Sequence, residues 1–107
     1  MSVQEKIKTT VTSNPVVLFM KGSPQMPMCG FSATATQILQ LCGVEHFAAV
    51  DVLQDPEIRQ GIKEYANWPT IPQLYVNGEF VGGSDIMREM YQSGELQKLL
   101  EGAKKPA

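Results

Sequence analysis

The sequence predicts a single α/β domain in which a mixed four-stranded sheet carries helices on both faces. Residues 16–20 (VVLFM) form an unbroken apolar run of strand length, typical of a strand that is covered on both sides. Asn77-Gly78 stands between two short strand-like segments and is a strong signal for a β-hairpin. Between these landmarks, apolar residues recur with helical spacing, so the first strand is expected to lead through a helix to a parallel second strand.

The N-terminal half is expected to contain two helices and two strands. Residues 2–5 (SVQE) have the pattern of a capping box that starts a first helix, and Asn14-Pro15 ends it before the apolar run. A second helix is expected after Cys29, because apolar residues follow at i, i+3, i+4 and i+7, and Gly43 can close it. Residues 46–52 are then expected to form the second strand.

The C-terminal half is expected to contain one more helix, the hairpin and two final helices. Asp55-Pro56 supplies an N-cap and a first-turn proline for the third helix. Residues 73–81 are expected to form the hairpin, and Ser84 is expected to cap the helix that follows it. The domain is placed at residues 1–102, and residues 103–107 (AKKPA) are expected to be a flexible C-terminal tail.

Composition argues against several classes of function. The 107 residues fit one compact domain, and a net charge of −2 argues against non-specific nucleic-acid binding. No apolar run approaches the roughly 20 residues of a membrane span, and the N-terminus lacks the layout of a signal peptide. With only 2 cysteines there is no disulfide framework. We therefore expect a cytoplasmic protein that acts on neither nucleic acid nor membrane.

The two cysteines are expected to differ in role. Cys29 stands directly before a helix, where unpaired backbone N–H groups and the helix dipole favour an anion, and Lys21 can add a positive charge nearby. An activated thiol is therefore favoured over a structural one. Cys42 lies on the apolar stripe of the same helix, which indicates a buried, inert thiol. A helix between them would separate the two by roughly 20 Å, too far for a disulfide.

Three motifs together resemble the CGFS-type monothiol glutaredoxins. They are residues 21–32 (KGSPQMPMCGFS), residues 68–72 (WPTIP) and residues 82–85 (GGSD), and the match runs through nearly the whole chain. The resemblance implies the thioredoxin fold, with strands in the order 2-1-3-4. It also implies that the protein binds glutathione and a [2Fe–2S] cluster. The implied cluster ligand and catalytic residue is Cys29.

The resemblance also implies a glutathione site drawn from both halves of the chain. Its implied residues are Lys21, Arg59, Ile71, Gly83, Ser84 and Asp85. This set suits a peptide with two carboxylates and one amine. The cations can bind the glycine carboxylate, a helix N-terminus at Ser84 can bind the γ-glutamyl carboxylate, and Asp85 can bind the amine. Ile71-Pro72 resembles a cis-proline loop, which would present the Ile71 backbone as a strand edge for the extended peptide.

Plainer interpretations stand beside these roles. Without the resemblance, Arg59 and Lys63 would be interpreted as a solvated helix face; with it, Arg59 is favoured and Lys63 is secondary. Ser84-Asp85 can also serve as an ordinary helix cap. Trp68 is equally suited to flank a pocket or to pack in the core.

The number of thiolates that a cluster needs implies that two copies of the chain would hold it. A [2Fe–2S] cluster held by thiolates needs four. One chain offers one accessible thiolate and one bound glutathione offers a second, so a cluster implies a homodimer with two glutathiones. Ser32 stands where a dithiol redox protein would have its second cysteine. A single-cysteine route for reducing mixed disulfides between proteins and glutathione stays chemically open as the alternative function.

The spacing before the cysteine favours the cluster carrier within this resemblance. Seven residues, 22–28, separate Lys21 from Cys29, a longer loop than dithiol glutaredoxins have. The resemblance implies that such a loop accompanies cluster binding and disfavours disulfide reduction, so oxidoreductase activity is expected to be weak at most. The implied partners are a BolA-type protein and apo iron–sulfur acceptor proteins.

Overall fold

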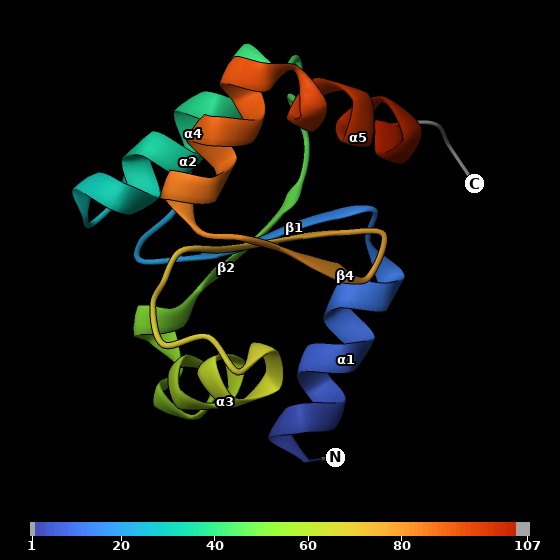
Figure 1. Cartoon of the computed structure of the whole chain (residues 1–107). Coiled ribbons are helices and arrows are strands. Elements are labelled where there is room, and N and C mark those ends of the chain that lie inside the picture. Colours follow the sequence, from blue (N-terminus) through green and yellow to red (C-terminus); the bar gives the residue numbers. More distant parts are fainter. Residues whose placement is uncertain (1, 105–107) are drawn as a thin grey trace.

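The computed structural model describes residues 2–104 of the chain. Helices and strands alternate along its first half, and a hairpin and two helices complete the second (Figure 1). The elements are α1 (Val3–Ser13), β1 (Val16–Met20), α2 (Gly30–Leu41), β2 (Ala48–Asp51), the short 3₁₀ helix η1 (Val52–Gln54), α3 (Pro56–Ala66), β3 (Gln73–Val76), β4 (Glu79–Gly82), α4 (Ser84–Ser93) and α5 (Glu95–Lys104).

The four strands form one mixed sheet in the order β2-β1-β3-β4. β1 lies inside the sheet, where Val17 is opposite Ala48 of the parallel strand β2 and opposite Tyr75 of the antiparallel strand β3. β4 pairs antiparallel with β3 and forms the other edge. The mixed sheet and the order 2-1-3-4 expected for a thioredoxin fold are therefore confirmed.

Helices cover both faces of the sheet and divide the core in two. Figure 1 shows α2, α4 and α5 on one face and α1 and α3 on the other. Alternate residues of β1 enter different halves of the core: Val16, Leu18 and Met20 pack on the α2 side, and Val17 and Phe19 pack on the α1 side. This double burial explains why the segment is apolar at every position.

Several local signals in the sequence are confirmed. Ser2 caps α1 through a reciprocal capping box with Glu5. Gly43 follows the C-cap of α2 with a φ of 81°, and its N–H donates to the Gln40 carbonyl. In the hairpin, Asn77 and Gly78 have φ values of 52° and 82°, the left-handed pair that a tight type I′ turn requires.

Three boundaries differ from those expected. The second strand is shorter, because Val52 already belongs to η1. The N-cap of α4 is Gly83, and Ser84 is the first helical residue, so the cap expected at Ser84 is wrong. Helix α5 continues to Lys104, and Ala103 is buried in line with the leucines of that helix, so a tail that begins at 103 is wrong for these two residues. Residues 105–107 of that tail lie outside the described part.

Membrane insertion finds no support in these helices. The longest described helix, α2, has 12 residues, and none within residues 2–104 is long and apolar enough to cross a bilayer.

The elements that matter for function are the C-terminal end of β1, the first turn of α2, the segment between α3 and β3, and the first turn of α4.

Candidate functional site

Cys29 is the N-cap residue of α2. Its backbone is extended, with φ −153° and ψ 155°, and its Sγ accepts a hydrogen bond of 3.3 Å from the Ser32 backbone N–H. Sulfur thus takes the place that an Asp or Ser oxygen has in most helix caps. The side chain is partly exposed, whereas Cys42 at the other end of the helix is buried. Both expected environments are confirmed.

A buried hydroxyl connects Cys29 to the end of β1. Ser32 is 0% exposed, and its Oγ accepts a 3.0 Å hydrogen bond from the Lys21 backbone N–H. The same Oγ lies 3.2 Å from the Cys29 Sγ. One serine therefore contacts both the reactive sulfur and the residue whose side chain supplies the nearby positive charge.

These surroundings act on the pKa of Cys29 in opposite directions. Burial of the thiol raises the pKa, but the contacts with the Ser32 hydroxyl and N–H and with the Phe31 N–H, together with the charge of Lys21, outweigh burial. The net result is a pKa below the ordinary value of a cysteine thiol. The helix mouth and the lysine were predictable from the sequence, while the serine contact was not.

The loop between Lys21 and Cys29 is a closed hairpin. Ser23 and Met26 exchange backbone hydrogen bonds of 3.1 and 3.0 Å, and the Met28 N–H donates to the Lys21 carbonyl at 2.8 Å. Gly22 has a φ of 89°, and a Cβ at that position would overlap the Met26 carbonyl oxygen. The loop therefore fixes the path of the chain into Cys29.

Asp51, at the end of β2, holds the start of this loop from outside. Its Oδ1 accepts hydrogen bonds from the Gly22 N–H at 2.9 Å and from the Leu53 N–H at 3.0 Å. The Gly22 contact is the largest cause that lowers the pKa of Asp51. Sequence reasoning missed this residue, because its partner lies 29 positions earlier in the chain.

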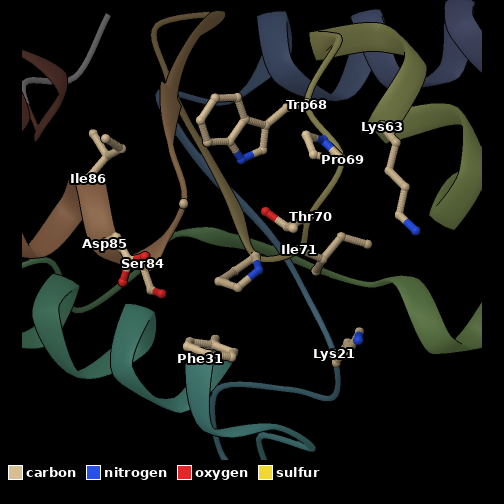
Figure 2. A pocket seen from close by; sticks show the side chains of 12 residues that line it. Lys21, Phe31, Lys63, Trp68, Pro69, Thr70, Ile71, Ser84, Asp85 and Ile86 are labelled. Atoms are coloured by element: carbon tan, nitrogen blue, oxygen red, sulfur yellow. The ribbon is translucent and has the colours of Figure 1, made fainter.

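Beside the thiol lies a cavity of about 370 Å³. Figure 2 shows Lys21 and Phe31 at one edge, Trp68 and Pro69 at the opposite edge, Lys63 on one side, and Ser84 and Asp85 on the other. The complete lining is Lys21, Phe31, Lys63, Trp68, Pro69, Thr70, Ile71, Pro72, Gly83, Ser84, Asp85 and Ile86. Five of the six expected ligand-binding residues are thus brought together.

The sixth residue, Arg59, is not part of this lining. It is exposed on α3, one turn before Lys63, and Lys63 lines the cavity in its place. The role expected for Arg59 stays a prediction. Cys29 itself is not part of the lining either, although Phe31, two residues later, is. The sulfur therefore lies beside the cavity, outside its wall.

The wall made by residues 68–72 is held in place by a buried amide. Gln73 is 0% exposed, and its Nε2 donates to the carbonyl oxygens of Trp68 at 3.2 Å and Thr70 at 3.1 Å. Its Oε1 accepts from the Tyr75 hydroxyl at 3.1 Å. Burial, with a smaller contribution from Tyr65, raises the pKa of Tyr75 and keeps that hydroxyl protonated as a donor. Sequence reasoning took Gln73 only as a strand residue, although an amide that opens an otherwise apolar strand was an available signal.

The remaining features of this wall agree with the expected geometry. The Ile71–Pro72 peptide bond is cis, as expected. Trp68 lines the cavity and also packs against Phe80 with ring centroids 5.5 Å apart, so it has both roles that were left open. A Cβ on Gly83 would come within 3.2 Å of the Pro72 carbonyl oxygen, so the start of α4 lies tightly against this loop.

The first turn of α4 faces the cavity without a capping side chain. Its N-cap, Gly83, makes no side-chain hydrogen bond, and Ser84 and Asp85 both line the cavity. The backbone N–H groups of such a turn favour an anion. The cavity therefore has lysines on one side, and a helix N-terminus with one carboxylate on the other.

A metal ion has no ready set of ligands in one chain. Among residues 2–104, no group of three or more His, Cys, Asp or Glu side chains could hold one. Cys29 is a single thiolate source at the site, since the other cysteine lies buried at the far end of α2.

Comparison with known proteins now places this arrangement in a family. Residues 16–81 match the family model named Glutaredoxin. An uncharacterized monothiol glutaredoxin, ycf64-like, from Synechocystis sp. is 64% identical over 98 residues, which are 92% of this chain and 91% of the relative. Glutaredoxin 4 of Escherichia coli is 60% identical over 97 residues, 91% of this chain and 84% of the relative.

The chain belongs to the monothiol glutaredoxins. The solution structure of reduced poplar apo GrxS14 has the same fold, with a TM-score of 0.82 and 50% sequence identity, over 94% of this chain and 92% of that one. The family expected from the three motifs is therefore confirmed. In this glutaredoxin, Cys29 at the mouth of α2 lies beside a cavity whose lining includes the first turns of α2 and α4 and the segment before β3.

Proposed function

We propose that this glutaredoxin binds glutathione in the cavity and carries a [2Fe–2S] cluster, held between two copies of the chain, to acceptor proteins. The observation that carries the proposal is the position of one partly exposed thiol of lowered pKa next to a cavity of about 370 Å³, which two lysines, a helix N-terminus and Asp85 line. The cluster is the cargo of this protein and not a fixed part of it.

The charges around the cavity match the two ends of glutathione. Lys21 and Lys63 lie on the side that would receive the glycine carboxylate, and Arg59, one helical turn before Lys63, would extend this positive end. The uncapped first turn of α4 would receive the γ-glutamyl carboxylate, and Asp85 its amine. Ile71, between the two ends, would pair with the peptide backbone.

Ligand counting supports a homodimer as the loaded form. The cluster needs four thiolates. Cys29 supplies one per chain, and a glutathione bound beside it supplies another, so two copies complete the set without further residues of the chain. BolA-type proteins and apo iron–sulfur proteins are the proposed partners, and the cytoplasm, where thiols stay reduced, is the proposed compartment.

The competing function is reduction of glutathione mixed disulfides by Cys29 alone. The lowered pKa of Cys29 favours it, because the thiolate is the attacking species. The loop of residues 22–28 is closed by its own backbone hydrogen bonds and leads directly into Cys29, so it would set how the sulfur meets an incoming disulfide. We propose that this geometry keeps the turnover low.

Reconstitution of the purified chain with iron, sulfide and glutathione tests the carrier function. We expect a dimer with the visible absorption of a [2Fe–2S] cluster, loss of that absorption in Cys29→Ser, and its retention in Cys42→Ala. The matched cysteine variant shows that loss is specific to the helix mouth. A second arm replaces glutathione by a small thiol without the two peptide ends, which should give a less stable cluster. Absorption retained in Cys29→Ser would contradict the proposal.

A further inference from the structure

The segment of residues 68–72 forms one wall of the cavity, and few of its backbone groups can donate a hydrogen bond to a ligand. Both prolines of the segment lack an N–H, and the Trp68 N–H donates to the Lys63 carbonyl at 3.0 Å. The N–H groups with which this wall could bind a ligand are therefore those of Thr70 and Ile71, and both residues line the cavity (Figure 2). The direction of these groups decides whether the wall can do so.

The buried side chain of Gln73 sets the direction of the peptide plane between Thr70 and Ile71. Gln73 is 0% exposed, and its Nε2 donates to the Thr70 carbonyl at 3.1 Å, so this carbonyl points into the protein interior. The peptide is trans, so its C=O and N–H point in opposite directions. The Ile71 N–H therefore points away from Gln73 and the interior, on the side of the wall where the cavity lies.

The amide of Gln73 is satisfied in one orientation only. A primary amide has two N–H donors on its nitrogen and accepts on its oxygen. The two donors bind the carbonyl oxygens of Trp68 at 3.2 Å and Thr70 at 3.1 Å, and Oε1 accepts from the Tyr75 hydroxyl at 3.1 Å. The reversed amide would place Oε1 against two carbonyl oxygens, neither of which can donate. The clamp on the Thr70 carbonyl therefore has a fixed direction.

We propose that Gln73 is a positioning residue of the cavity, whose amide turns the Thr70–Ile71 peptide so that the Ile71 N–H can bind the backbone of an extended peptide ligand. The inference rests on the proposed function, because glutathione is the peptide proposed for this cavity. It adds that a side chain with no exposed surface, which a ligand in the cavity does not touch, sets part of the affinity for that ligand.

The first test measures the direction of the Ile71 N–H by residual dipolar couplings of the ¹⁵N-labelled chain, without glutathione and without cluster. Gln73→Met keeps the length of the side chain and removes both donors. Tyr75→Phe is the matched control, because it removes one hydrogen bond from the same buried network and leaves both Nε2 donors in place. We expect the Ile71 coupling to change in Gln73→Met and to stay in Tyr75→Phe, with the couplings of β1 unchanged in both.

The second test measures glutathione binding by isothermal titration calorimetry. The dissociation constant should rise roughly tenfold in Gln73→Met, the effect of one misaligned peptide hydrogen bond, and less than about threefold in Tyr75→Phe. Glutathione should shift the Ile71 amide resonance in the wild-type chain and leave it nearly unshifted in Gln73→Met. The amide resonances of Ser84 and Asp85 should shift in both, a pattern that general destabilisation would not give.

Thermal unfolding shows whether the variants are folded. If Gln73→Met does not fold, Gln73→Glu takes its place with the same expectation, because it has the same shape and at most one side-chain proton for two carbonyl oxygens. A wild-type Ile71 N–H that points away from the cavity, an unchanged coupling in a folded Gln73 variant, or an equal change in Tyr75→Phe would overturn the inference. Absence of glutathione binding in the wild-type chain would contradict the proposed function, while the dipolar couplings would still decide the role of Gln73.

Discussion

Helix α2 begins at one cysteine and ends at the other. At its start, Cys29 is partly exposed, accepts backbone hydrogen bonds, and lies near the charge of Lys21. At its end, Cys42 is 8% exposed, its backbone N–H donates to the Ile38 carbonyl, and its side chain belongs to the core under α4 and α5. The helix dipole is positive at the first end and negative at the second, so it favours a thiolate only at Cys29.

Position on the helix decides what each thiol can do. The two residues are chemically identical and belong to the same rigid element. One end offers unpaired N–H donors and solvent access, and the other offers carbonyls and apolar neighbours. The two ends of α2 should therefore differ in reactivity, in their effect on stability and in their response to a third thiol.

The largest expected effect is on alkylation. At pH 7, iodoacetamide should modify Cys29 at least roughly a hundredfold faster than Cys42, because the first thiol has a lowered pKa and is accessible, whereas the second is protected by the fold. Timed quenching followed by peptide mass spectrometry gives both rates in one sample. In denaturant, the two rates should converge, which is the internal control. Similar rates in the folded chain would show that the two ends of α2 are not chemically distinct.

A smaller effect is expected on the pH dependence of folding. The folded pKa of Cys29 lies below its ordinary value, so ionisation stabilises the fold at pH values above the unfolded pKa of about 8.5. This contribution is lost as the pH falls through the folded pKa. The free energy of unfolding lost in Cys29→Ala should therefore grow as the pH rises from 5 to 9. Chemical denaturation at several pH values measures it.

Cys42→Ala is the matched control for that measurement. Removing one buried sulfur should cost about 1 kcal/mol of unfolding free energy through lost packing in the core. A cost at Cys29 that stays flat with pH would contradict the assignment of the charged thiol to the helix mouth.

The features that depend on short-range sequence patterns could be predicted from the sequence. The apolar run of β1, the cysteine before α2 and the Asn77-Gly78 turn each contain their own structural reason within a few residues. Asp51 was missed because its partner, Gly22, lies 29 positions earlier and is brought to it by the parallel pairing of β1 with β2. The partners of Gln73 lie within five residues of it, but no sequence pattern shows that the 68–72 segment turns its carbonyl oxygens toward the amide.

The sequence pattern also could not show which of two basic side chains, one helical turn apart, lines the cavity. Arg59 and Lys63 occupy the same face of α3, and only the position of that helix against the 68–72 segment determines that Lys63 lines the cavity. At the C-terminus, the basic and proline-containing composition suggested a tail. The stripe of Leu96 and Leu100 continues one turn further to Ala103, and burial of that stripe extends α5.

The smallest expected effect is on disulfide-reductase turnover in Ser32→Cys. The new thiol would stand where the Ser32 Oγ lies 3.2 Å from Cys29 Sγ, and a short closure to the S–S bond length of about 2.05 Å is within reach of cysteines spaced in this way. We expect thiol titration of the oxidised variant to show an intramolecular disulfide. The matched variant Thr36→Cys, one turn further along α2, should show none.

Turnover on a small glutathione mixed disulfide should nevertheless stay near the wild-type rate. Attack requires the incoming sulfur in line with the thiolate, and the hairpin of residues 22–28, held by Asp51 and by its own backbone hydrogen bonds, is the same in the variant. The variant also loses a strong acceptor for the Lys21 N–H, which weakens the arrangement that keeps Cys29 ionised. A rise to the rate of a dithiol glutaredoxin would mean that the missing second thiol alone limits turnover at Cys29. The loop of residues 22–28 would then have no effect on the rate.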